Sequence, residues 1–244
     1  MAHGEQPLYS IRDLLLTRAT GPGYSLRVSR LDIPVGEKIA ITGASGCGKS
    51  TALDLLGMVL RPDRVDRFVF APPGQTEADV GACWRDGQRD RLAGLRQRHM
   101  GYVLQTGGLL PFLSVYENME LSARALNRPD RREHVERIAR SLGVERLLRS
   151  RPDTLSIGER QRVAIGRALA SGPAVLLADE PTAALDPLHA GAVMELLLGA
   201  VADYAVTLVL VTHAPEIVRA AGLREFHMRV DPQEDGSVVA VLEE

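Results

Sequence analysis

The chain has 244 residues, of which 45% are hydrophobic, and its formal net charge is −2. That length suffices for one α/β core with a small appended subdomain, and the charge balance excludes a strongly basic nucleic-acid-binding protein. Cys47 and Cys83 are the only cysteines, too few for a disulfide framework, and they indicate a reducing compartment.

The hydropathy of the sequence does not predict membrane insertion. Residues 1–10 lack the basic start and apolar core of a signal peptide, so we expect none. No apolar run approaches the roughly 20 residues that a membrane-spanning helix needs. We therefore expect a soluble protein, whose link to any membrane comes through a partner.

The N-terminal part predicts an antiparallel β layer. Residues 11–16 and 24–33 are typical of strands joined by a turn at 21–23. A short apolar strand at 39–42 is followed by a helix from residue 50 to about 60, because Pro62 disfavours a helical residue before it.

The middle of the chain is less regular. We expect a short strand at 67–71, an exposed polar insertion at 72–90, a helix at 90–98 and a buried strand at 100–105 that ends on Gln105. Residues 114–148 are charged and have apolar positions at helical spacing. They predict a helical subdomain that covers about residues 106–170.

Apolar strands alternate with helices in the last third. A helix runs from the segment at 155–159 to about 170, apolar strands are expected at 174–178 and 205–211, and a helix begins at Asp186. A terminal hairpin is expected from 226–230 and 238–242. Together these patterns predict one α/β domain over residues 1–244, with a mostly parallel sheet, an antiparallel β layer and a helical subdomain.

The segment between the strand at 39–42 and the next helix carries the clearest motif. It reads GASGCGKS, which matches the phosphate-binding pattern G-x-x-x-x-G-K-[ST] in the strand–loop–helix context that the pattern requires. The candidate nucleotide-binding residues are Gly43, Ala44, Ser45, Gly46, Cys47, Gly48, Lys49, Ser50 and Thr51. Lys38 and Lys49 are the only lysines in a chain with 29 basic residues. Lys49 therefore places a compact ammonium group where it can reach two phosphates at once.

Two acidic residues end the apolar strand at 174–178. Asp179 is a candidate metal ligand and Glu180 a candidate base for an attacking water. An acidic pair after a strand is often only a solvated turn, but together with the phosphate-binding loop it indicates catalysis of phosphoryl transfer.

The run LSIGERQRVAIGRAL at residues 155–169 resembles the signature of ATP-binding-cassette (ABC) ATPases. Taken alone, Ser156 to Glu159 would be read as a helix-capping box. The family's other motifs follow in order: the phosphate loop, Gln105, PTAALD at 181–186, and His213. The resemblance covers nearly the whole chain and implies a P-loop NTPase fold that binds ATP and Mg²⁺ and hydrolyses ATP.

The resemblance also assigns roles to individual residues. It implies that two cassettes form a homodimer around ATP, in which the signature of one copy contacts the γ-phosphate held by the other. The trans contacts would come from Ser156, Ile157, Gly158 and Glu159. Ser50, Gln105 and Asp179 would hold the metal, Glu180, His213 and Gln105 would act in catalysis, and Asp186 would lie at the dimer seam.

Some residues depart from the family pattern. Ile157 replaces a glycine; because a capping box would place residue 157 in a first helical turn, we expect a helical rather than a left-handed backbone there. Cys47 stands where serine is usual. No aromatic residue occupies the adenine-stacking region near 18–19, and Tyr24 is the alternative.

Residues 95–121 resemble the bacterial branch that serves lipoprotein release, macrolide efflux and cell division. In that branch this stretch docks a transmembrane permease subunit, which implies a location at the cytoplasmic face of the inner membrane. The leading hypothesis is an ATPase that drives such a subunit to export or extract a substrate. A cassette that transmits force across the membrane without transport is the alternative. A soluble cassette for DNA repair or translation is disfavoured, because neither a second cassette nor a nucleic-acid footprint is present.

Overall fold

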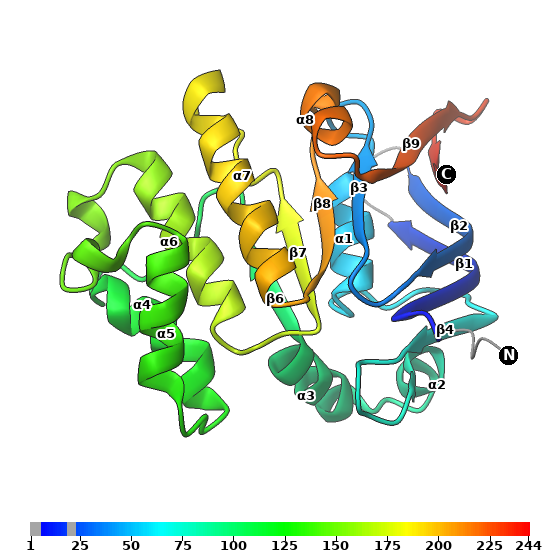
Figure 1. The fold of residues 1–244 in the computed structure, drawn as a ribbon. Helices are drawn as coiled ribbons and strands as arrows, with labels where there is room; N and C mark the ends of the chain where they lie inside the picture. The colour runs from blue at the N-terminus through cyan, green and yellow to red at the C-terminus, as the bar shows by residue number, and fades with distance from the viewer. Residues whose placement is uncertain (1–5, 19–22) are drawn as a thin grey trace, which may run out of the picture. The chain divides into compact units, whose positions relative to one another are not determined.

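The computed structural model describes residues 6–18 and 23–244 of the chain (Figure 1). The described chain forms two compact units. The first unit contains residues up to Arg96 together with Val209–Glu244, and the second contains Gln97–Leu208. The turn expected at 21–23 falls largely on residues 19–22, outside the described residues.

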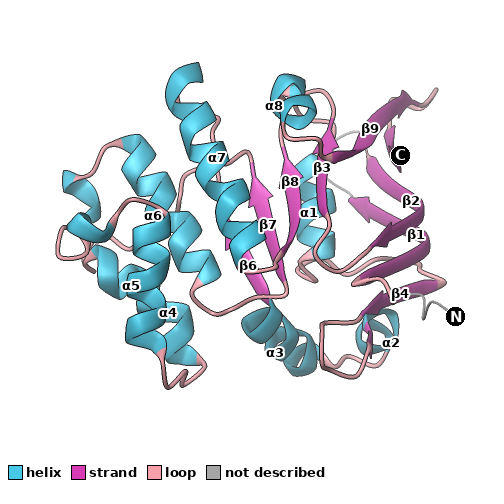
Figure 2. Ribbon diagram, in the orientation of Figure 1, coloured by secondary structure: helices cyan, strands magenta, loops and turns pink. Residues whose placement is uncertain are grey.

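The first unit is built on a mixed β-sheet (Figure 2). Its strands are β1 (Tyr9–Arg18), β2 (Tyr24–Ile33), β3 (Lys38–Thr42), β4 (Arg67–Phe70), β5 (Ala78–Asp79), β9 (Arg224–Pro232) and β10 (Val238–Glu243). Their order is β5-β4-β1-β2-β10-β9-β3. The expected antiparallel pairing of the first two strands is confirmed, with Tyr9 opposite Ile33 and Arg18 opposite Tyr24.

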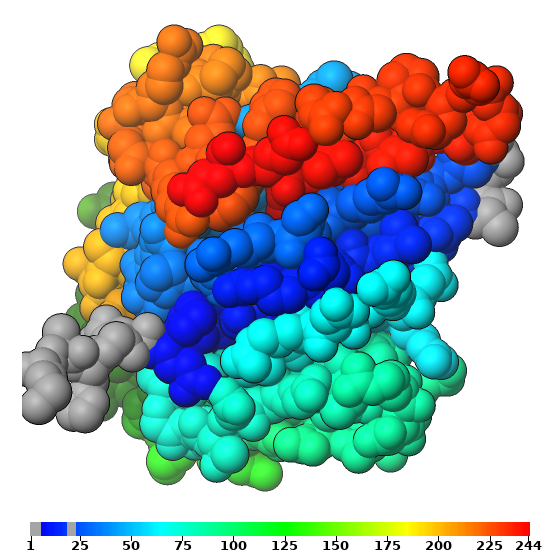
Figure 3. All heavy atoms as spheres, turned by 90° about the vertical axis from the view of Figure 1, so that its right-hand side faces the viewer, coloured from blue at the N-terminus to red at the C-terminus, as the bar shows by residue number. Residues whose placement is uncertain are grey.

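The C-terminal hairpin is also confirmed, and it completes this sheet. β9 and β10 pair with each other in antiparallel register, while β10 runs parallel to β2 and β9 parallel to β3. Figure 3 shows the red C-terminal strand lying directly beside the blue N-terminal strands. Segments from opposite ends of the sequence therefore share one sheet.

Three helices belong to the first unit: α1 (Lys49–Leu56), α2 (Val80–Arg85) and α8 (Pro215–Ala220). The helix expected to reach about residue 60 ends earlier, at Leu56, because Met58 takes a left-handed backbone (φ 55°) and breaks the hydrogen-bond ladder. The hydroxyl of Tyr9, fully buried on β1, donates to the carbonyl of Leu56 at 3.1 Å and ties the end of α1 to the sheet.

The expectation of an exposed insertion at 72–90 is wrong in part. It contains β5 and α2, whose Val80 and Cys83 are at most 1% exposed. Asp79 starts the helix by accepting a hydrogen bond from the Ala82 amide at 2.8 Å. A helix this short buries only a few side chains, so its apolar periodicity is hidden among polar neighbours.

The second unit contains the strands β6 (Met100–Val103) and β7 (Val175–Asp179), which are parallel. Its helices are α4 (Val115–Ala125), α5 (Arg131–Ser141), α6 (Ile157–Leu169) and α7 (Pro187–Asp203), with short 3-10 turns at Glu145–Leu147 and Pro152–Thr154. The charged helical stretch expected at 114–148 is thus two helices, separated where Asn127 adopts φ 52°. The extent of a helical subdomain at 106–170 stays a prediction.

Two elements cross the boundary between the units, α3 (Arg89–His99) and β8 (Thr207–Val211). All five residues of β8 are buried, as expected for an apolar run inside a parallel sheet.

Helix α6 is the centre of the second unit. It contacts β6, α4, α5 and α7. A β-carbon at Gly166 would lie 2.5 Å from the Met119 side chain on α4, and one at Gly101 on β6 would lie 2.4 Å from the carbonyl oxygen of Ala168. Glycine at these two positions lets the elements approach α6 closely. In the described part of the chain, no helix combines the length and apolar character needed to cross a bilayer.

Helix α5 contains a histidine, His134, that is buried inside the second unit. His134 is 4% exposed, and its ring stands edge-on to Tyr204 with centroids 5.8 Å apart. Burial, followed by the charges of Arg128 and Arg137, lowers the pKa of His134 below its ordinary value of 6.5, against an opposing effect of Asp130.

We predict that this histidine costs stability at low pH. Above about pH 6.5 the imidazole is neutral in both states; below it the unfolded chain binds a proton more readily than the folded chain, so the free energy of unfolding falls. The loss per pH unit is at most about 1.4 kcal/mol. Urea unfolding at pH 7.5 and 5.5 should show a smaller loss for His134→Phe than for the wild type. Equal losses would contradict the prediction.

Candidate functional site

The phosphate-binding motif forms the loop between β3 and α1 in the first unit. Its three glycines have left-handed or otherwise positive φ angles: 145° at Gly43, 76° at Gly46 and 105° at Gly48. Side chains rarely tolerate these angles, and a β-carbon on Gly43 would also lie 2.9 Å from both the Cys47 sulfur and the Met228 carbonyl oxygen. Such a loop, opening a helix, is an anion-binding arrangement of backbone N–H groups.

Lys49 is held at the mouth of this loop. It is 5% exposed, and its Nζ donates to the carbonyl oxygens of Gly43 at 3.1 Å and Ala44 at 3.0 Å. The ammonium therefore lies across the loop rather than in solvent, placed to meet an anion that the loop amides bind.

His213 lies at the same edge of the first unit. The amide of Thr212 donates to the carbonyl oxygen of Ile41 at 3.3 Å, so the end of β8 lies next to the end of β3. His213 follows directly and is exposed, while the buried Thr212 hydroxyl accepts from the Ala214 amide at 3.1 Å and shapes the turn. The structure thus brings the phosphate loop and His213 together in one unit.

In the second unit, β7 ends at the two acidic residues. Asp179 is its last residue, and Glu180 follows with φ 44°, a left-handed backbone that is rare for a residue with a side chain. The carbonyl of Glu180 accepts from the Ala183 amide at 3.1 Å, which closes the turn after the strand. Strain of this kind clusters at functional sites, where surrounding structure maintains it.

Asp186 caps the next helix. Its carboxylate accepts hydrogen bonds from the amide of His189 at 3.3 Å and from the Nδ1 of His189 at 2.6 Å. The amide bond, and then the side-chain bond, lower the pKa of Asp186 below its ordinary value. Asp186, which the resemblance puts at the dimer seam, is therefore ionised at neutral pH and stands at the N-terminus of α7.

Gln105 is exposed, in a turn after β6 rather than at the end of a strand. The strand expected to reach Gln105 ends at Val103, because the chain turns where the Gly107 amide donates to the Leu104 carbonyl at 2.9 Å. Two side chains from α6 hold this turn: Gln161 donates to the carbonyl of Leu104 at 3.4 Å, and Arg167 to those of Gly107 at 2.9 Å and Gly108 at 2.7 Å.

The sequence patterns did not identify Gln161 and Arg167 as residues that position the turn of Gln105. Gln161 is 5% exposed, and burial lowers the pKa of Arg167. The sequence does contain an indication of this role, because both are polar residues on a helix that is otherwise apolar on its buried face. Periodicity alone assigns such residues to solvent, and only their contacts show that they fasten the loop of Gln105.

The segment at 156–159 begins α6 with the expected capping box. The Ser156 hydroxyl accepts from the Glu159 amide at 3.3 Å, while the Glu159 carboxylate accepts from both the amide and the hydroxyl of Ser156 at 2.8 Å. These bonds lower the pKa of Glu159. Ile157 is the first helical residue and is 49% exposed. The expectation of a helical backbone at Ile157 is confirmed.

The signature helix presents an open N-terminus. A β-carbon on Gly158 would meet nothing closer than the Leu185 side chain at 3.9 Å, so space lies in front of the first turn. The structure groups Gln105, Asp179, Glu180, Asp186 and residues 156–159 within the second unit, and the phosphate loop and His213 within the first.

The chain matches a known protein family over more than half of its length. The model of the "ABC transporter" family matches residues 26–183. The chain is 36% identical over 237 residues to the macrolide export ATP-binding/permease protein MacB of Shigella flexneri, covering 96% of this chain and 34% of MacB. It is 35% identical over 242 residues to the lipoprotein-releasing system ATP-binding protein LolD of Chromohalobacter salexigens, covering 95% and 97% of the two chains. The chain thus spans about a third of the MacB relatives and nearly all of LolD.

Solved structures share the fold. The structure of cbiO1 from Clostridium perfringens, part of the ABC transporter complex cbiONQ, gives a TM-score of 0.77 at 28% identity over 96% of this chain and 87% of that chain. A dimeric structure of MJ0796, a bacterial ABC transporter cassette, gives 0.74 at 31% identity, covering 94% and 96%. A post-hydrolysis dimer of MJ0796 bound to ADP and Pi gives 0.72 at 29% identity with the same coverage.

The left-handed backbone at Glu180 generates a stability prediction. Glycine adopts that conformation at little cost, whereas a β-carbon costs about 1 kcal/mol. Glu180→Gly and Glu180→Ala both remove the carboxylate, so their difference isolates the backbone strain. Urea unfolding should show Glu180→Gly to be more stable than Glu180→Ala by about 1 kcal/mol. An alanine variant as stable as the glycine variant would show that residue 180 is not strained.

Proposed function

Because this chain belongs to the ABC transporter family, we propose that it is an ATP-hydrolysing cassette that drives a transmembrane partner. The observation that carries the proposal is the loop between β3 and α1. Its three glycines at positive φ, and the buried Lys49 bonded across it, form a phosphate site at a helix N-terminus.

In the proposed reaction, the amides of residues 43–51 and the ammonium of Lys49 bind the β- and γ-phosphates of ATP. The oxygens of Ser50, Gln105 and Asp179 are the hard donors that Mg²⁺ prefers, and they would hold it. Held there, Mg²⁺ would neutralise charge that develops on the phosphates. Glu180 accepts a proton from the attacking water, while His213 contacts the γ-phosphate.

The second half of the proposed site comes from another copy of the chain. Ser156, Ile157, Gly158 and Glu159 offer the N-terminus of α6 to the γ-phosphate of the partner copy, and Asp186 lies at the seam. Apolar exposure supports this assignment: Ile157 is 49% exposed and Leu188, two residues after Asp186, is 82% exposed. A second copy would cover both side chains.

The loop around Phe112, at residues 110–114 of the second unit, is the proposed docking surface for the transmembrane permease subunit. Phe112 is 65% exposed, yet its loop is fixed from beneath. The fully buried Asn118 donates to the carbonyls of Leu110, Leu113 and Ser114 at 3.0–3.2 Å, and Arg151 donates to the carbonyl of Phe112 at 2.7 Å. An aromatic side chain held out of a well-bonded loop fits a protein contact better than a packing defect.

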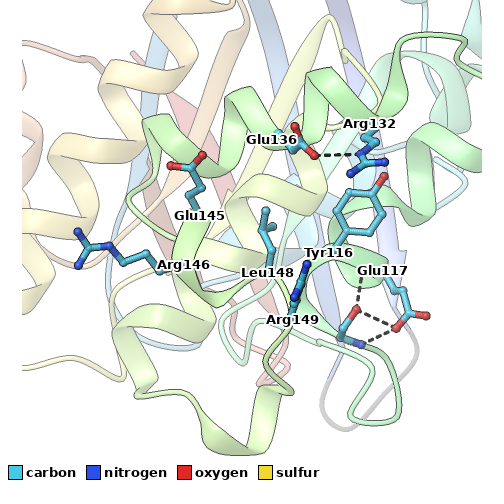
Figure 4. A pocket seen from close by; sticks show the side chains of 9 residues that line it. Tyr116, Glu117, Arg132, Glu136, Glu145, Arg146, Leu148 and Arg149 are labelled. Atoms are coloured by element: carbon cyan, nitrogen blue, oxygen red, sulfur yellow. Dashed lines mark hydrogen bonds and ion pairs between the residues drawn. The ribbon is translucent and has the colours of Figure 1, made fainter.

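A cavity of about 660 Å³ borders this loop (Figure 4). It is lined by Ser114, Tyr116 and Glu117 from the start of α4, by Arg132 and Glu136 from α5, and by Glu145, Arg146, Leu148 and Arg149. The lining combines charged side chains of both signs with Leu148 and Tyr116, which suits a helix of the permease with mixed charge. Through this contact the cassette would sit at the cytoplasmic face of the membrane, and the permease would select what is exported or extracted.

Glu180→Gln tests the proposed chemistry. Loss of the base should slow hydrolysis by about 10²- to 10⁴-fold while the phosphate contacts remain, so the variant should bind ATP and accumulate as an ATP-bound dimer. Lys49→Ala is the matched control, expected to lose binding and dimerisation together. Single-turnover hydrolysis with gel filtration measures both. A near wild-type rate for Glu180→Gln would reject the assigned role.

Phe112→Ala tests the docking surface. Affinity purification of the tagged chain from solubilised membranes should recover a membrane protein with the wild type and several-fold less with Phe112→Ala. ATP binding should be unchanged. Val59→Ala, which truncates a side chain that is 54% exposed in the first unit, is the control and should retain the partner. Equal recovery with both variants would exclude this surface. The identity of the recovered protein separates transport from force transmission without transport.

A further inference from the structure

Tyr24 contacts the outer side of the phosphate loop. It is the first residue of β2, and its hydroxyl donates to the carbonyl oxygen of Cys47 at 3.4 Å. Cys47 immediately precedes Gly48, which is the N-cap of α1. The side chain therefore reaches from the sheet to the last peptide group before the helix begins.

The direction of this contact has a consequence for the next amide. A trans peptide unit points its C=O and its N–H in opposite directions. When the Cys47 carbonyl is turned toward Tyr24, the N–H of Gly48 in the same peptide is turned away from Tyr24. It then faces the side of the loop on which an anion is bound by backbone amides.

The ring of Tyr24 also covers Gly48. A β-carbon on Gly48 would lie 1.7 Å from the Tyr24 hydroxyl oxygen and 2.6 Å from its ring carbon Cζ. Glycine is needed at position 48 for two reasons. Its φ of 105° is a backbone conformation that residues with side chains avoid, and the absence of a β-carbon leaves room for the tyrosine ring. The peptide between Cys47 and Gly48 is held by a bond at its oxygen and by a ring against its glycine.

The tyrosine itself is well anchored and stays a donor. Its backbone pairs with Arg18 on β1 and with Val238 on β10, and the carbonyl of the preceding Gly23 accepts from the Val238 amide at 3.0 Å. Partial burial raises the pKa of Tyr24 to about 12, so the hydroxyl keeps its proton at neutral pH and can only donate to a carbonyl.

We propose that Tyr24 is a positioning residue for phosphate binding, which orients the Cys47–Gly48 peptide so that the Gly48 N–H meets the bound phosphates. This inference rests on the proposed ATP-binding function and assigns to Tyr24 a role through the loop backbone. It does not require contact with the adenine base.

Tyr24→Phe removes the hydroxyl and keeps the ring, so it isolates the hydrogen bond. We expect the dissociation constants of ATP, GTP and inorganic triphosphate to rise together by about three- to tenfold, the range for one neutral hydrogen bond. The KM for ATP should rise by a similar factor, while kcat at saturation stays within about twofold. Thermal unfolding without nucleotide should be close to that of the wild type.

Tyr204→Phe is the matched control, because it removes a tyrosine hydroxyl in the other unit, where the Tyr204 ring packs edge-on to His134 and belongs to neither proposed binding surface. It should leave all three affinities unchanged. Unchanged affinities in Tyr24→Phe would overturn the proposal. A loss confined to ATP, with triphosphate unaffected, would also overturn it and make Tyr24 a base contact. Failure of the wild type to bind any of the three probes would instead reject the proposed function.

Discussion

A loop that binds anions through its own backbone cannot be built from ordinary residues, and the first unit is arranged around that constraint. Between β3 and α1 the chain must alternate between right- and left-handed conformations so that successive amides converge. Gly43, Gly46 and Gly48 supply the positive φ angles. Glycine leaves such a loop without side-chain packing, so neighbouring elements must hold it. Lys49 bonds two of its carbonyls from inside, and Tyr24 contacts a third from outside.

In the second unit, polar side chains from one helix, α6, hold the loop that carries Gln105. The loop that carries Gln105 has little apolar content to bury, and its carbonyls need partners. Gln161 and Arg167 provide them from α6, and Arg162 bonds to the carbonyl oxygens of Leu142 and Gly143. The same helix begins with the capping box at Ser156. Movement of α6 would therefore displace the signature segment and the Gln105 loop together, because both are fastened to one rigid element.

At the end of β7, the proposed role of Glu180 and local stability make opposite demands on one residue. A carboxylate placed directly after a buried strand needs an abrupt turn, and Glu180 takes a left-handed backbone to make it. Glycine would suit that backbone, but it carries no carboxylate. The strain persists because the flanking strand is fully packed and the following turn is hydrogen-bonded through Ala183 and Leu185. A rule of local conformational preference thus fails at the residue that we propose as the catalytic base.

The sequence by itself predicted most of the strands and helices, and it named the candidate residues for the proposed chemistry. Apolar runs such as residues 175–178 favour buried strands. The glycines before Lys49 form a motif that is recognised from neighbouring residues alone. The capping box at Ser156 is equally local, and from it the helical backbone of Ile157 followed. Local patterns failed where burial depended on distant partners. Helix α2 looked like an exposed loop because only Val80, Gly81 and Cys83 are buried.

Tertiary structure alone decided the contacts between segments far apart in the chain. The hairpin of β9 and β10 was predictable, but its insertion between β2 and β3 was not, since strand order depends on which edges meet. Arg167 and Gln161 could be read as solvated helix residues until the loop carbonyls were placed beside them. Tyr24 lies 23 residues from Cys47; no local pattern records that separation, and only the pairing of β2 in the sheet brings the hydroxyl to the phosphate loop.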